Sequence, residues 1–233
     1  FGLGENLSAM LHYTTLEDIL RWSPLDIPTS VLRDYLYQKS LYPSSIAATK
    51  EDLAMSQAVA RQALYLAMQS ARRDFPRGIA SIKPTLTPMF EPILAGGSTL
   101  SSASHPGQGL LLLLDSLQPV GVTTVILDQN NLLPLLGAAA SQNNLLPVQV
   151  IESGAFLSVG TVVSPVVSAA YGTPILNAKL TYESGVEARV ELKYGNLELL
   201  PLATGESGKL TIQCLRGADV GFDLEFGQPS FDQ

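Results

Sequence analysis

The sequence has little charge overall and few basic residues. Charged residues make up 15% of the 233 positions, and 14 Lys and Arg stand against 21 Asp and Glu, for a formal net charge of -7. Proteins that bind nucleic acids draw their affinity from clustered positive charge, which neutralises phosphates. The composition therefore excludes DNA or RNA as an expected partner.

Cysteine is scarce too, since Cys214 is the only one in the chain. One cysteine cannot close an intrachain disulfide and cannot supply the several thiolates of a structural zinc site. No secretion signal is recognisable, and the most apolar run, Leu110 to Leu114, is far shorter than the ~20 residues of a membrane-spanning helix. We expect a cytoplasmic protein with no membrane segment and no metal site.

Recognised catalytic patterns are missing as well. The chain has no Gly-x-Ser-x-Gly nucleophile elbow and no His-Glu-x-x-His helix, and its only histidines are His12 and His105. A hydrolase built on Ser101, Ser102 or Ser104 with His105 would lack an orienting acid at a recognised spacing. A loop histidine at this place could contact a ligand phosphate or ribose, but such a residue is more often simply solvated.

Two acids, Asp115 and Asp128, could in principle act in proton transfer. Each is more simply explained as a residue that caps or ends a structural element. No catalytic residue is therefore assigned.

Apolar residues are plentiful, at 46% of the chain, which is enough for a buried core. Up to about Pro147, helix-like and strand-like segments alternate, and this alternation indicates an α/β domain. Thr15 with Asp18, and Thr49 with Asp52, have the spacing of N-terminal helix caps. We predict helices over 16–22, 30–42, 50–73, 106–117 and 132–140, and strands over 88–95 and 122–127.

The long helix 50–73 is predicted to be amphipathic, with one apolar stripe packed on the domain. Its polar residues, Gln62 among them, fall largely away from that stripe. The stripe consists of Leu53, Ala60, Leu64, Ala67, Met68 and Ala71.

After Pro147 the helical pattern stops, and short β-like runs follow, many of them separated by glycine turns. Strands are predicted over 148–151, 156–163, 176–182, 186–192, 197–202, 209–214 and 222–226. This spacing is typical of an antiparallel sandwich or a small barrel. We therefore predict two domains, an α/β domain over 1–147 and a β-rich domain over 148–233 that folds without the first.

The most informative segment runs from Ile93 to Leu100, where an apolar strand ends in Gly96-Gly97-Ser98. Paired glycines let a flat ligand lie against the backbone, because no side chain blocks the approach. A tight turn is the simpler interpretation of the same residues. Gly96, Gly97 and Ser98 are the candidate binding residues.

This segment resembles the adenosine-contacting motif of actin-like and heat-shock-70-like ATPases. Other segments, spread over nearly the whole chain, resemble the C-terminal half of the glutamate mutase accessory family, often labelled MutL and unrelated to DNA mismatch repair. The segments that carry this second resemblance include Leu20-Arg21-Trp22, Leu32-Arg33-Asp34-Tyr35, Pro106-Gly107-Gln108, Leu117-Gln118-Pro119-Val120, Gly160-Thr161-Val162-Val163 and Tyr194-Gly195-Asn196-Leu197.

The resemblance implies an incomplete actin-like, ribonuclease-H-like subdomain followed by a β-rich domain. It also implies a protein that assists an adenosylcobalamin-dependent mutase. In actin-like ATPases the first acidic, Gly-Thr-rich loop that holds phosphate and metal would lie before Phe1. ATP and Mg²⁺ would thus belong to the full-length protein, and Gly2 and Gly4 count for little as a remnant of a phosphate loop.

We therefore expect a non-catalytic C-terminal fragment that is not an enzyme and has no cofactor of its own. A structural or protein-interaction module without nucleotide binding is the alternative. The sequence leaves the oligomeric state open.

Overall fold

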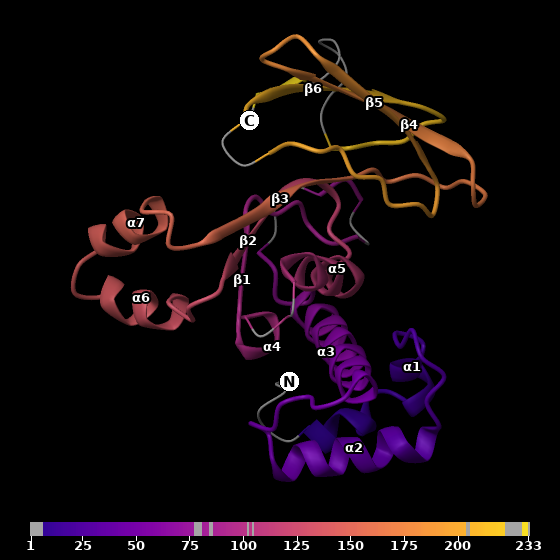
Figure 1. The fold of residues 1–233 in the computed structure, drawn as a ribbon, viewed down its shortest axis with the longest axis vertical. Helices are drawn as coiled ribbons and strands as arrows, with labels where there is room; N and C mark the ends of the chain where they lie inside the picture. The colour runs from indigo at the N-terminus through magenta and orange to yellow at the C-terminus, as the bar shows by residue number, and fades with distance from the viewer. Residues whose placement is uncertain are drawn as a thin grey trace. The chain divides into compact units, whose positions relative to one another are not determined.

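The computed structural model describes residues 7–76, 81–83, 86–101, 103, 105–203, 206–221 and 230–232. It is a mixed α/β structure with two small sheets (Figure 1), which confirms the predicted α/β class. Tertiary contacts group the chain into a first unit, Phe1–Ile79, Pro92–Gln118 and Thr124–Gly160, and a second unit, Ala80–Glu91, Pro119–Thr123 and Thr161–Gln233. The predicted division into 1–147 and 148–233 stays a prediction.

The first unit begins with four helical segments. They are the 3-10 helix η1 (Leu7–His12), α1 (Leu16–Leu20), α2 (Thr29–Leu41) and α3 (Lys50–Ala71). Both predicted caps are confirmed, because Thr15 with Asp18, and Thr49 with Asp52, form complete capping boxes. In each box the threonine side chain accepts a hydrogen bond from the aspartate N–H, and the aspartate side chain accepts one from the threonine N–H. Two otherwise unpaired backbone donors are thereby satisfied.

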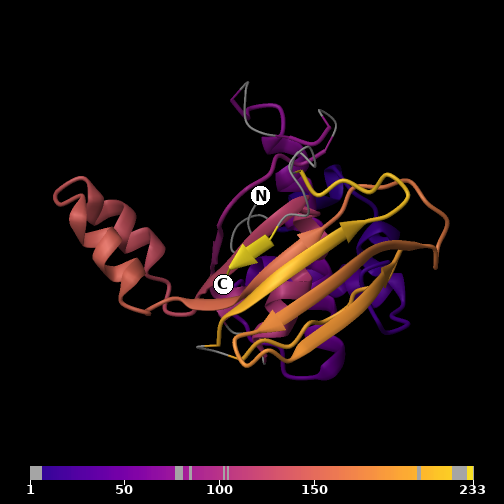
Figure 2. The same cartoon turned by 90° about the horizontal axis from the view of Figure 1, so that it is seen from above.

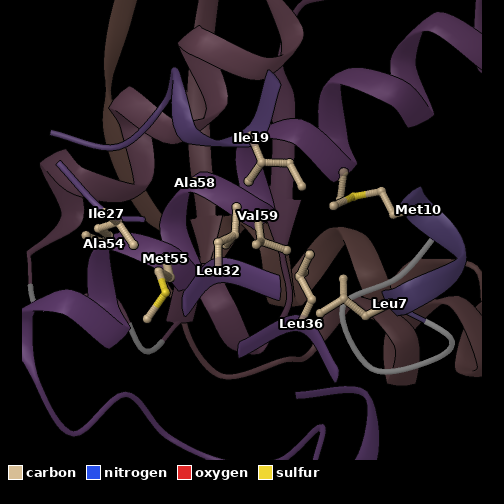
Figure 3. Packing of buried hydrophobic residues seen from close by; sticks show 11 residues of the cluster. Leu7, Met10, Ile19, Ile27, Leu32, Leu36, Ala54, Met55, Ala58 and Val59 are labelled. Atoms are coloured by element: carbon tan, nitrogen blue, oxygen red, sulfur yellow. The ribbon is translucent and has the colours of Figure 1, made fainter. Parts of the chain in front are cut away.

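These four segments enclose one hydrophobic cluster (Figure 3). The helix predicted over 50–73 is confirmed as α3, but its predicted apolar stripe is wrong, because Ala60 is the only member of that stripe that is buried. The buried face is made by Ala54, Met55, Ala58, Val59, Ala60, Gln62 and Ala63. Small side chains on this face let the neighbouring helices approach closely, whereas the larger leucines chosen from the sequence remain half-buried.

A three-stranded sheet of order β1-β2-β3 follows the helical part. Its elements, with the helices between β1 and β2, are β1 (Ile93–Gly96), α4 (Ser98–Ser101), α5 (Pro106–Leu117), β2 (Gly121–Asp128) and β3 (Leu157–Ser164). β1 and β2 run parallel, with Gly96 opposite Asp128. A Cβ at Gly109 would lie 3.5 Å from Leu127 Cδ1, so the glycine lets α5 rest closely on the end of β2.

Two short helices, α6 (Leu133–Ala140) and α7 (Leu145–Glu152), connect β2 to β3. The strand predicted over 148–151 is wrong, because these residues lie in α7. The sequence predicts the end of helical structure at Pro147, but this residue occupies the first turn of α7, where a missing N–H has no helical partner to lose. The Asn143 side chain accepts a hydrogen bond from the Leu145 N–H (3.0 Å), which supports this helix start.

The second unit contains an antiparallel sheet of order β5-β4-β6-β7 (Figure 2). Its strands are β4 (Pro174–Tyr182), β5 (Glu187–Lys193), β6 (Gly208–Cys214) and β7 (Ser230–Asp232). The range 197–202 is not a strand: Leu197 and Leu199 are 68% and 86% exposed, and Pro201 has no N–H to donate. The strand predicted over 222–226 lies outside the described residues.

The two faces of this sheet differ because side chains alternate along each strand. Leu176, Ala178 and Ile212 lie on one face, in a hydrophobic cluster that also includes Val220. The opposite face carries the polar residues of the same strands, such as Lys179, which stands opposite Arg189 and Thr211. The antiparallel β-rich part is thus an amphipathic sheet with a single apolar face.

None of the helices in the described part of the chain combines the length and the apolar composition needed to cross a bilayer.

Candidate functional site

The Gly96-Gly97-Ser98 segment forms the turn between β1 and α4. Gly97 has a φ of +116°, a conformation that residues with a Cβ rarely adopt. Its carbonyl accepts hydrogen bonds from the Leu100 and Ser101 N–H groups, both at 3.0 Å. A tight turn is therefore present here, as the simpler interpretation of the sequence expected.

The surface of this turn is bare backbone. Gly96, Gly97 and Ser98 are all exposed, and a Cβ built on Gly97 would meet no atom within 4 Å. The carboxyl ends of parallel strands are a common place for ligands in α/β sheets. Open space over exposed backbone leaves room for a flat group at this edge.

Asp128 lies directly beside the turn, at the end of β2. It is 1% exposed, and its carboxylate accepts hydrogen bonds from the backbone N–H groups of Asn130 (3.2 Å) and Leu133 (2.7 Å). Asp128 therefore ends β2 and starts α6, which confirms the interpretation that it terminates an element. A Cβ on Gly96 would come within 3.3 Å of Asp128 Cβ, so the glycine leaves room for this packing.

From the sequence, Asp128 was not expected to lie beside the Gly-Gly turn. The signal that could have joined them is the order strand, helix, strand between Ile93 and Asp128. Parallel strands joined by one helix bring their carboxyl ends to the same edge of a sheet. Asp128 thus lies opposite Gly96 in the sheet, and its two carboxylate oxygens accept hydrogen bonds from the backbone N–H groups of Asn130 and Leu133, between β2 and α6.

The other sequence candidates engage their own neighbours. His105 caps α5, with its Nδ1 accepting from the Gly107 N–H (3.1 Å), and Asp115 pairs with Arg61 (2.7 Å). The Ser101 hydroxyl donates to the Ser98 carbonyl (3.3 Å), and His12 ends η1. Ser102 and Ser104, like Gly2 and Gly4, lie outside the described residues.

Metal and thiol chemistry find little support in the part of the chain that the structure describes. No three or more His, Cys, Asp or Glu side chains come together there in a way that could hold a metal ion. Burial raises the pKa of the Cys214 thiol, and the nearby Asp219 carboxylate raises it further. A raised pKa keeps the thiol protonated, which makes it a poor nucleophile.

A second candidate surface lies on the polar face of the antiparallel sheet. A shallow hollow of about 490 Å³ is lined there by Asn177, Ala178, Lys179, Arg189, Val190, Glu191, Thr211 and Gln213. The nearby Glu187 carboxylate accepts from Lys179 (3.1 Å) and from Arg189 (2.7 Å). These bonds lower the pKa of Glu187. Since the local charges are largely neutralised, the hollow does not favour a ligand of either sign.

A protein-family model described as "MutL protein" matches residues 1–154. The matched range includes the Gly96–Ser98 turn, Asp128, α6 and α7. No curated protein and no solved structure matches the chain.

Proposed function

Because the chain belongs to the MutL protein family, the accessory proteins of glutamate mutase, we propose that it is a non-catalytic part of such an accessory protein. In this role the Gly96–Ser98 turn contacts the adenosine of a nucleotide bound by the full-length protein. The accessory protein would in turn assist an adenosylcobalamin-dependent mutase.

The observation that carries the proposal is the bare backbone at the carboxyl end of β1. The turn is exposed, Gly97 has a conformation that favours glycine, and open space faces it. A purine ring gains contact area by lying flat against such a surface, and any side chain at these positions would reduce that contact. Gly96, at the start of the turn, has no side chain to collide with Asp128 Cβ, which would lie 3.3 Å from a Cβ built on the glycine.

The proposal includes an actin-like, ribonuclease-H-like subdomain, incomplete in this chain, and a β-rich domain of sandwich or barrel-like type. Support comes from the parallel strands β1 and β2 joined through α5, and from the amphipathic antiparallel sheet. One parallel crossover is common to many α/β folds, so the family membership carries most of this assignment.

No ATP hydrolysis is expected from this chain. The sequence contains no acidic, Gly-Thr-rich loop of the kind that holds phosphates and Mg²⁺ in actin-like ATPases. The buried carboxylate nearest the turn, Asp128, already accepts two backbone hydrogen bonds. Turnover above background that co-purifies with the chain through several columns would contradict this expectation.

Photolabelling with 2-azido-ATP tests the adenosine contact, because a covalent label also captures weak binding. Affinity is expected to be low, since one side of a cleft lacks the contacts that enclose the base and fix the phosphates. We expect label on peptides around Gly97, reduced by excess ATP. Gly97→Ala should lose most of this label, because the added methyl group projects into the open space over the turn.

Gly154→Ala is the matched control. Gly154 also has a positive φ, +78°, with no atom within 4 Å of a built Cβ, so the substitution adds similar backbone strain in the same unit. Labelling should be unchanged in this variant. Label that is absent, or not displaced by ATP, would instead favour the alternative function, a protein-interaction module without nucleotide binding.

A further inference from the structure

Strand β5 lies at one edge of the four-stranded sheet, whose order is β5-β4-β6-β7 (Figure 2). It pairs along its length with β4 and, among the described residues, with no other strand. The outward N–H and C=O groups of an edge strand can form hydrogen bonds with a further strand. The sheet can therefore be extended by another antiparallel or parallel segment at β5.

Charges of alternating sign line the polar face of β5. They occupy every second position of the strand, and all four are exposed: Glu187, Arg189, Glu191 and Lys193. Val190 and Leu192 point to the other face, where they pack partly buried against the hydrophobic cluster of the sheet. In the part of the chain that the structure describes, neither Glu191 nor Lys193 forms an ion pair.

This pattern of charges is complementary to itself in one arrangement. When a second copy of β5 runs antiparallel with Val190 opposite Val190, Glu187 stands opposite Lys193 of the other copy, and Arg189 stands opposite its Glu191. Each of these pairs occurs twice because of the symmetry. Opposite charges directly across two strands attract, so all four charged residues of each copy face a partner of the opposite sign. The other face then brings apolar side chains together.

Other registers of the same two strands are unfavourable. A shift of the centre to Arg189 places Arg189 opposite itself and Glu187 opposite Glu191, and a shift to Glu191 likewise opposes like charges. A slip by one residue sets the charged face of one strand beside the apolar face of the other. The complement that β5 requires, read in the antiparallel direction, is glutamate, a base, glutamate and a base, which is the order of its own charges.

We propose that β5 pairs antiparallel with β5 of a second copy of this chain, centred on Val190, and that the two sheets thereby become one continuous sheet across a twofold axis. Arg189 also bonds Glu187 of its own strand (2.7 Å), and its guanidinium has enough N–H donors for both carboxylates. β5 lies outside residues 1–154, which match the family model, and the inference does not rest on the proposed adenosine contact.

Sedimentation equilibrium of the full chain over a concentration series tests the proposal, and a monomer–dimer equilibrium is expected. Arg189→Glu and Glu191→Arg should each raise the dimer Kd at least about tenfold, because each variant opposes like charges at two symmetric places. Circular dichroism should show that both variants remain folded, since the substituted side chains are exposed.

Mixing the two variants distinguishes self-pairing of β5 from other causes of dimerisation. An equimolar mixture of Arg189→Glu and Glu191→Arg should form mixed dimers with a Kd within about threefold of the parent, because each new charge then faces an opposite charge on the other chain. The double variant that carries both substitutions should dimerise equally well with itself, for the same reason.

Lys209→Glu is the matched control. Lys209 is exposed on the same face of the sheet, in β6, which β4 separates from β5, and its reversal should leave the dimer Kd within about twofold of the parent. A chain that stays monomeric at its highest soluble concentration would overturn the proposal. So would a dimer that Arg189→Glu leaves intact, one that Lys209→Glu weakens as strongly, or a mixture of the two variants that remains as monomeric as each variant alone.

Discussion

The helical core of η1 and α1 to α3 and the hairpin of α6 and α7 both belong to the first unit, and both are rich in apolar residues. In the core, leucines such as Leu32 and Leu36 are fully buried, whereas in the hairpin Leu135 and Leu145 are mostly exposed. The core helices also carry charged residues on their outer faces, and the hairpin carries none before Glu152. Apolar composition alone therefore does not tell whether a helix is buried, because burial needs a partner that covers it.

The largest expected difference between the two regions is in the free energy of unfolding after loss of a leucine. Leu36→Ala should lower it by about 2–5 kcal/mol, because Leu36 is 0% exposed and its removal leaves a cavity. Leu135→Ala, the same change at a 67% exposed site, should alter it by no more than about 0.5 kcal/mol in the monomer. Urea denaturation at low protein concentration measures both, and equal losses would contradict the comparison.

An intermediate effect is expected at Gln62, a polar residue within the buried face of α3. Gln62 is 3% exposed, its Oε1 accepts from Trp22 Nε1 (2.7 Å), and its Nε2 donates to Thr14 Oγ1 (2.8 Å). Gln62→Leu would leave the indole N–H without this acceptor, at a cost of about 1–3 kcal/mol.

Trp22 is the only tryptophan in the chain, so its fluorescence reports this change directly. We expect a shift of the emission maximum in Gln62→Leu together with the loss of stability. Gln69→Leu, at a partly exposed position of the same helix, should change neither. An unchanged emission spectrum in Gln62→Leu would show that the hydrogen bond to Trp22 is not made.

The smallest effect concerns the cap of α1. Two hydrogen bonds from Thr15 hold the pKa of Asp18 below its ordinary value of 3.8. The bond from the Thr15 N–H has the larger effect, and the bond from the Thr15 hydroxyl comes second. A carboxyl whose pKa is lower in the folded state stabilises the fold above its unfolded pKa, and this stability is lost as pH falls through the folded pKa. Asp18→Asn should flatten the pH dependence of stability below about pH 4.

Glu17→Gln is the control for this effect, because it removes a carboxylate from the same first turn and leaves the capping box intact. In this variant the free energy of unfolding should still fall with pH on the acid side as it does in the parent. If the free energy of unfolding changed with pH equally in Asp18→Asn and in the parent, the cap of α1 would not contribute to the pH dependence of stability.

Much of the local structure could be predicted because it depends on residues close together in the chain. The capping boxes at Thr15 and Thr49, the start of α5 at Pro106 and the Gly-Gly turn each follow from short spacings. The strand predicted over 148–151 was wrong, because Pro147 lies in the first turn of α7 and the β-branched residues after it continue the helix. The adenosine contact at Gly96, Gly97 and Ser98 stays a prediction, although the exposed turn it requires is present.

The sequence by itself determined the α/β class, the two caps and the family resemblance, because these depend on periodicity, spacing and motifs within short segments. Only the tertiary structure decided which face of α3 is buried, that Gly96 lies opposite Asp128, and that the apolar residues of α6 and α7 remain exposed. The physical reason is that register and burial are properties of pairs of segments. A single segment carries its own hydrogen-bonding and packing preferences, but it does not specify which other segment, or which other molecule, will cover it.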